Sequence, residues 1–284
     1  MDLQVLDEAT WRARAEAHAS RVDGFVGPHL ARRREGRNHP VHDFLFTYYS
    51  QRPAQLRRWH PGYGVALASA PEYHDLKGYR DGTVSAEYVA AHSTLIDSIR
   101  RLLKAAAGRP AHLGCFGLHE WAMVHRATES TEGTRHPWPL RLGPAGTDQV
   151  VESHRISCSH FDAFRFFTPT ARPLNTLAPG NDDRTAYEQP GCLHGNMDLY
   201  KHAFRLTPMI CSDLVADCFE LARDIRVLDM RASPYDLGDL GYQPVRIETA
   251  GGKQEYVAAQ RDFAERAAPL RQRLVDECER LLAG

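Results

Sequence analysis

Apolar residues recur along most of the chain at intervals of three and four positions, which is the spacing of an amphipathic α-helix. The pattern predicts about eight helices: residues 8–24, a short one from Pro28 to Gly36, one from Pro40, 85–107, 111–126, one from Leu193, 212–230 and 253–282. Alternating or β-branched residues predict short strands at 150–157 and 245–247.

These elements predict a mainly α-helical fold, with one compact domain spanning residues 1–284 and a few short β-strands. Two long stretches rich in Gly, Pro and polar residues, 128–148 and 168–191, are predicted to be lid-like loops beside the functional site. The stretch 128–148 is also the best candidate for a weak domain boundary. The amphipathic helix at the C-terminus either packs on the body of the protein or forms a homodimer.

The composition narrows the class of protein. Of the 284 residues, 43 % are hydrophobic and 25 % are charged, which is enough apolar material for a buried core. The net charge of −1 provides no overall field that would attract DNA or an anionic membrane, so polyanion binding would need a local patch. Six cysteines without a CxxC motif, no signal-peptide pattern and no long apolar run indicate a reduced, cytoplasmic protein that does not bind membranes.

Candidate chemistry concentrates between residues 152 and 204, where histidines, cysteines and aspartates lie close to aromatic residues. In the motif HFDAFRFF, Asp162 stands among four phenylalanines, including Phe161 and Phe164, so a partly desolvated carboxylate is expected beside rings. His160 precedes it and is a candidate acid, base or metal ligand.

A second group of candidates lies on predicted helices. His194 and Asp198 are four residues apart and therefore on one helical face, where they fit either a metal site or a hydrogen bond that holds the helix in place. His119 and Glu120 are adjacent, so they point about 100° apart and do not both face one site squarely.

Arginines and aromatic residues are interspersed between positions 28 and 63, as they are on many nucleic-acid-binding surfaces. The same pattern also fits aromatic core residues with a solvated arginine rim. The candidate substrate-binding residues in this part of the chain are Tyr48, Arg52, Arg57, Arg58 and Trp59. Further along the chain, the candidates are Tyr200, Arg231 and Tyr235.

Several long motifs, among them HPVHDFLFTYYSQRPAQLRRWHPG, FGLHEWAM, HFDAFRFFT and GCLHGNMDLYKHAF, resemble a mainly actinobacterial family labelled 3-methyladenine DNA glycosylase. The resemblance covers most of the chain, roughly residues 11–273. It implies DNA repair by hydrolysis of the glycosidic bond of an alkylated purine, with DNA as the partner. The resemblance itself assigns no catalytic residue, and the chain has neither a helix-hairpin-helix motif nor a helical repeat.

Three functions therefore remain open. In an N-glycosylase, a flipped base stacks between rings and a carboxylate, Asp162 first and Asp198 second, assists hydrolysis without a cofactor. In a metal-dependent enzyme, non-haem iron or zinc is surrounded by His160, His194 and Asp198, with His119, Glu120 and Glu220 as further candidates, and the substrate is a small anion. The third function is non-catalytic ligand binding.

Overall fold

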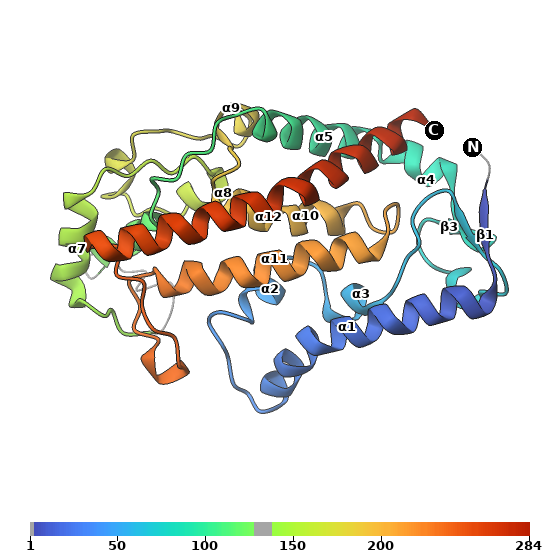
Figure 1. Cartoon of the computed structure of the whole chain (residues 1–284), viewed down its shortest axis with the longest axis horizontal. Helices are drawn as coiled ribbons and strands as arrows, with labels where there is room; N and C mark the ends of the chain where they lie inside the picture. The colour runs from blue at the N-terminus through green and yellow to red at the C-terminus, as the bar shows by residue number, and fades with distance from the viewer. Residues whose placement is uncertain (1–2, 128–137) are drawn as a thin grey trace. The chain divides into compact units, whose positions relative to one another are not determined.

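The computed structural model describes residues 3–127 and 138–284, and helices make up most of this part of the chain (Figure 1). Twelve α-helices and one small four-stranded sheet are present among the described residues, which confirms the predicted mainly α-helical fold. The chain divides into two compact units. Unit 1 comprises Met1–Lys104, Asp198–Ala222 and Pro269–Gly284, and unit 2 comprises Ala105–Met197 and Arg223–Ala268. None of these boundaries falls within residues 128–148.

Unit 1 begins with strand β1 (Gln4–Leu6) and the long helix α1 (Glu8–Arg34), whose first turn is capped by the side chain of Asp7. The predicted break at Pro28 is wrong, because the helix continues through it. Proline removes one helical hydrogen bond. Val22, Val26 and His29 are buried on both sides of Pro28, and this packing outweighs the loss.

The sheet of unit 1 joins β1 to strands that follow much later in the chain: β2 (Val65–Leu67), β3 (Tyr79–Arg80) and β4 (Thr83–Val84). Its order is β1-β2-β4-β3, with β1 parallel to β2 and the other pairs antiparallel. Three short helices lie between β1 and β4 in sequence: α2 (Phe44–Thr47), α3 (Pro53–Arg57) and the 3₁₀ turn η1 (Pro71–Tyr73).

The predicted helix over residues 85–107 is divided into α4 (Ala86–Ala91) and α5 (Ser93–Ala107). The division falls at His92, whose ring Nδ1 lies 2.7 Å from the carbonyl oxygen of Tyr88. A side chain that hydrogen-bonds to a backbone carbonyl oxygen competes with the regular helical hydrogen bonds.

Unit 2 contains shorter elements: α6 (Leu118–Ala122), α7 (Gly143–Ser153), α8 (Phe161–Phe164), the turns η3 (Arg172–Leu174) and η4 (Gly238–Leu240), and α9 (Arg184–Tyr187). Three long helices, α10 (Leu193–Arg205), α11 (Ser212–Arg231) and α12 (Ala250–Ala283), contribute residues to both units. The predictions from Leu193, Ser212 and residue 253 are therefore confirmed.

Several predicted elements of unit 2 are wrong. The first half of the expected strand at 150–157 is the end of α7, which ends at Ser153 and on which Val150 and Val151 are buried. The second half is not helical, and Ile156 forms an isolated parallel bridge with Asn175. The expected strand at 245–247 is irregular, and the helix expected over 111–126 is limited to α6. Of the predicted loop 128–148, residues 128–137 lie outside the described part of the chain.

Candidate metal centre

Three buried side chains from three helices converge in unit 2. His119 is on α6, His194 is in the first turn of α10, and Asp229 is in the last turn of α11. One nitrogen or oxygen atom from each residue lies within 4.8 Å of the corresponding atoms of the other two. Within residues 3–127 and 138–284, this is the one group of three or more His, Cys, Asp or Glu side chains with such spacing.

Local packing holds His119 opposite Asp229. Helix α6 starts directly after Gly117, whose φ of +69° lies in the left-handed region that favours glycine. Two residues beyond His119, the fully buried indole of Trp121 donates a hydrogen bond of 2.8 Å to the carbonyl oxygen of Ala232, just after α11. This bond fixes the short helix α6 against the end of α11.

The contact between His119 and Asp229 differs from an ordinary hydrogen-bonded pair. His119 Nε2 and Asp229 Oδ1 are 3.0 Å apart, yet both atoms are buried and neither has a hydrogen-bond partner, because the geometry is not aligned. Two neighbouring ligands of one metal ion, each at about 2.1 Å, lie roughly 3.0–3.4 Å apart. The separation and the misalignment therefore both fit two atoms that face a common ion.

The other oxygen of Asp229 is held by a buried arginine. Arg226 Nη1 donates hydrogen bonds to Asp229 Oδ2 at 2.5 Å and to Glu120 Oε1 at 2.9 Å. All three side chains are almost completely inaccessible to solvent. Glu120 thus acts through Arg226, one layer outside the ligands, and the adjacent residues His119 and Glu120 serve the same centre. Such outer partners orient metal ligands in known sites.

The protonation states suit metal binding. Burial lowers the pKa of His194 to about 3, and the nearby His119 and His160 act in the same direction. Burial alone raises the pKa of Asp229, but the neighbouring His119 and Arg226 lower it well below its ordinary value. At neutral pH the ring of His194 is therefore uncharged and Asp229 is ionised, which are the forms that bind metals.

A narrow cavity of about 20 Å³ adjoins two of the three residues, His119 and His194. This volume is about that of one ordered water molecule. The other lining residues include His160, Gln189, Tyr256 and three cysteines: Cys115, Cys158 and Cys192. Burial raises the pKa of all three thiols, that of Cys158 to about 12, and none of the three belongs to the group formed by His119, His194 and Asp229.

His160 lies beside the three-residue group in space without belonging to it, whereas Asp162 pairs with two arginines. His160 is buried, with its ring centroid 5.5 Å from that of His194 and its Nε2 3.8 Å from an oxygen of Glu188. Asp162 is half-buried and pairs with Arg165 at 3.2 Å and Arg184 at 3.7 Å. The nearby Phe161 and Phe164 are half-buried.

Asp198, expected to join His194 in a site, belongs to unit 1 and is absent from the three-residue group. Its Oδ1 accepts a hydrogen bond of 3.0 Å from the hydroxyl group of Tyr49, and its Oδ2 lies 3.3 Å from Lys201 Nζ. Tyr200 is fully buried and packs edge-on against Phe219, so its ring does not face solvent.

The basic and aromatic segment of unit 1 is only partly exposed. Trp59 is 2 % exposed, and the ring of Tyr48 stacks on Phe44 at 4.9 Å. Arg57 pairs with Asp23 at 2.7 Å, whereas Arg52 and Arg58 are exposed. Arg57, Arg58 and Trp59 line one pocket of about 660 Å³. The arginines thus partly match the predicted surface, and of the aromatic residues Tyr49 and Trp59 are buried while the others are half-buried.

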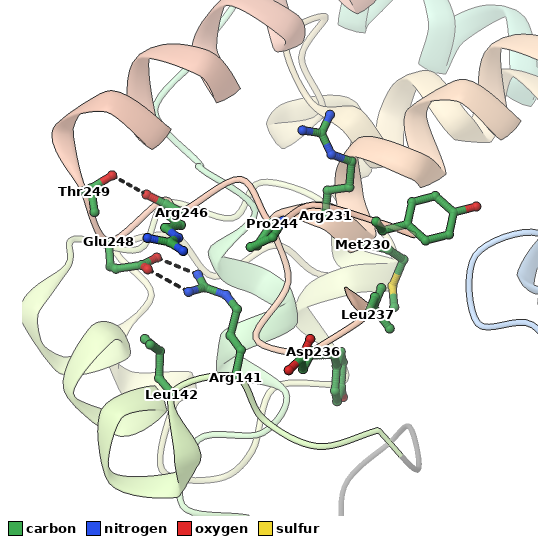
Figure 2. A pocket seen from close by; sticks show the side chains of 12 residues that line it. Arg141, Leu142, Met230, Arg231, Asp236, Leu237, Pro244, Arg246, Glu248 and Thr249 are labelled. Carbon is green, nitrogen blue, oxygen red and sulfur yellow. Dashed lines mark hydrogen bonds and ion pairs between the residues drawn. The ribbon is translucent and has the colours of Figure 1, made fainter. Parts of the chain in front are cut away.

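Two further candidates, Arg231 and Tyr235, line a pocket of about 500 Å³ in unit 2 (Figure 2). The sequence analysis did not include two residues of the candidate centre, Asp229 and Arg226. The available signal was an ionisable pair three residues apart inside the apolar stripe of the 212–230 helix. Charged residues are almost never fully buried unless they are paired.

Comparisons with protein-family models, with curated proteins and with solved structures found no match for this chain. Within the described residues, no helix combines the length and the apolar character that a membrane span requires.

Proposed function

We propose that the protein is a metal-dependent enzyme whose ion is bound by His119, His194 and Asp229. The observation that carries this proposal is the pair of buried atoms His119 Nε2 and Asp229 Oδ1, which are 3.0 Å apart without a hydrogen bond. Buried polar atoms without partners are costly, by about 1–3 kcal/mol each. A divalent cation between them would remove that cost for both atoms.

The ligand set indicates the kind of metal. Two histidines and one carboxylate with open positions are typical of non-haem iron(II) enzymes, and the same number of protein ligands is found in catalytic zinc sites. The cavity of about 20 Å³ beside His119 and His194 has room for one water molecule. Either metal would polarise a bound water or substrate atom there.

The N-glycosylase function implied by the sequence resemblance draws less support from the geometry. Asp162 already has two arginine partners, and Trp59 is buried, so neither is poised for a flipped base. Base excision therefore remains a prediction, and it requires a test separate from that of the metal centre.

Metal analysis of purified protein, after reconstitution with iron(II) or zinc under reducing conditions, tests the proposal. We expect about one ion per chain, and a loss of that ion in the Asp229→Asn and His119→Gln variants. Asp162→Asn is the matched control, because it removes the same type of group from the same unit and should leave metal content unchanged. Retention of stoichiometric metal by Asp229→Asn would refute the assignment.

The same variants separate the two chemistries. Release of alkylated bases from duplex DNA that is abolished by Asp162→Asn but unaffected by Asp229→Asn would support the glycosylase. No base release from the wild-type protein, together with stoichiometric metal, would favour the metal-dependent enzyme.

A further inference from the structure

A second pocket in unit 2 is large enough for an organic molecule, whereas the cavity beside the candidate metal centre is not. The cavity beside His119 and His194 has about 20 Å³ of space, whereas the pocket after the C-terminal end of α11 has about 500 Å³. Pockets for small organic ligands usually have volumes of about 300–1,000 Å³. Only the larger pocket can therefore enclose an organic molecule.

Three segments build this pocket: residues 141–142 before α7, residues 230–237 at the end of α11, and residues 242–249 before α12 (Figure 2). Backbone contacts hold the segments together. Arg141 N donates to Pro234 O and Asp236 N donates to Pro139 O, each at 2.8 Å. The walls are therefore fixed by the fold rather than by flexible side chains alone.

Two arginines of the pocket differ in their contacts. Arg141 binds both oxygens of Glu248, at 2.7 and 2.6 Å, as Figure 2 shows. Arg246 is exposed and lines the same pocket. Arg141 thus holds the carboxylate of Glu248, and the guanidinium group of Arg246 is accessible to a ligand.

The remaining arginine of the pocket, Arg231, is better neutralised. It donates hydrogen bonds to Glu255 and to the carbonyl oxygen of Gln243. The lining also includes the exposed carboxylate of Asp236. With Glu255 counted, the pocket has three arginines and three carboxylates, and among the described residues Arg246 is the one of the three arginines without an ion pair.

Apolar side chains form the rest of the wall: Leu142, Met230, Tyr235, Leu237, Tyr242 and Pro244. Leu142 is 38 % exposed, so its side chain is accessible to a ligand in the pocket. An exposed leucine beside a cation matches a ligand that has both an apolar body and a negative group. Inorganic anions would gain nothing from these apolar walls.

We propose that this pocket binds a small organic anion, with a carboxylate or phosphate group on Arg246 and an apolar body of about one ring against Leu142 and Pro244, which are among the more accessible apolar side chains of the wall. The proposal is independent of the metal centre, because it rests on the pocket alone. Charge-assisted hydrogen bonds to a guanidinium are stronger than neutral ones and select for the anion.

The backbone around Arg246 is also pre-positioned. A Cβ atom on Gly252, in the first turn of α12, would collide with the carbonyl group of Arg246. Only glycine allows this loop to pack so closely on the helix. Gly252→Ala should therefore displace Arg246 and weaken anion binding without removing any charge.

Calorimetric titration of metal-free full-length protein tests the proposal, with benzoate and phenyl phosphate as probes and benzylamine and inorganic phosphate as controls. We expect at least one organic anion to bind at least tenfold more tightly than benzylamine and inorganic phosphate. Arg246→Gln should weaken that binding about tenfold, and Leu142→Ser several-fold. Arg261→Gln is the matched control, because Arg261 is an exposed arginine of the same unit that does not line the pocket.

Three results would overturn the proposal: no preference for the organic anions over benzylamine, unchanged binding in Arg246→Gln, or equal weakening in Arg261→Gln. Because the titration uses metal-free protein, its failure leaves the metal assignment untouched, and loss of metal in Asp229→Asn does not bear on the pocket.

Discussion

Within the buried cluster of Arg226, Glu120 and Asp229, replacement of Arg226 should lower the free energy of unfolding most. Its side chain is fully buried and bonds two carboxylates, Glu120 and Asp229, which are 3 % and 0 % exposed. Counting only these three groups, the wild-type cluster carries a charge of −1. Arg226→Met would change this to −2, whereas Glu120→Gln would leave the balanced pair of Arg226 and Asp229.

The two variants should therefore differ in stability despite removing one charge each. Loss of one partner from a buried ion pair costs about 3–5 kcal/mol, because a charge stays buried without compensation. Arg226→Met should lower the free energy of unfolding by about that amount. Glu120→Gln retains an oxygen that accepts from Arg226, so we expect a loss of about 1 kcal/mol.

The double variant tests directly whether buried charge determines the stability of this cluster. Glu120→Gln combined with Arg226→Met leaves a single buried carboxylate, so it should be more stable than Arg226→Met alone. The coupling between residues in one network is typically about 0.5–3 kcal/mol. Urea denaturation followed by circular dichroism, in a chelator and at neutral pH, measures all three values.

Arg261→Met is the control for the loss of an arginine, since Arg261 is exposed and should change stability by less than about 0.5 kcal/mol. Equal losses for Arg226→Met and Glu120→Gln, or a double variant whose loss is simply the sum of the two, would show that buried charge does not govern this cluster.

Three further predictions follow from single contacts. Burial lowers the pKa of His60 to about 4, so the unfolded chain binds up to one more proton than the folded protein between pH 4 and about 6.5. The free energy of unfolding should therefore fall by up to about 1.4 kcal/mol per pH unit as the pH decreases through this range. His60→Gln should reduce that slope in pH-dependent denaturation. Asp198→Asn should cost about 1–3 kcal/mol in urea denaturation, because Tyr49 loses a charged acceptor, while elemental analysis should show unchanged metal content. Trp121→Phe should leave the buried carbonyl group of Ala232 without its hydrogen-bond donor and lower the free energy of unfolding by about 1–3 kcal/mol. It should also lower the affinity for zinc in a titration, and an unchanged affinity would contradict the role of this bond in placing His119.

The long helices were predictable because α5, α10, α11 and α12 each repeat their apolar residues over three turns or more. The helices of four or five residues, such as α6 and α8, are shorter than the window in which periodicity is visible. The segment at 150–157 was predicted wrongly because neighbouring valines favour strands in isolation. In the fold, Val150 and Val151 are buried on α7, and tertiary packing overrides the local preference.

The site residues were also only partly predictable from the sequence, for a different physical reason. Spacing rules such as i, i+4 find ligands that share one helix, and they favoured His194 with Asp198. Here the fold takes one ligand from each of three helices, so the relevant separations are 75 residues from His119 to His194 and 35 from His194 to Asp229. The sequence indicates such ligands only as ionisable residues on apolar faces. Asp229 satisfies that criterion together with Arg226, because buried charged groups within the stripe of a long helix require polar partners, and Glu120 of α6 is one, since it accepts a hydrogen bond from Arg226.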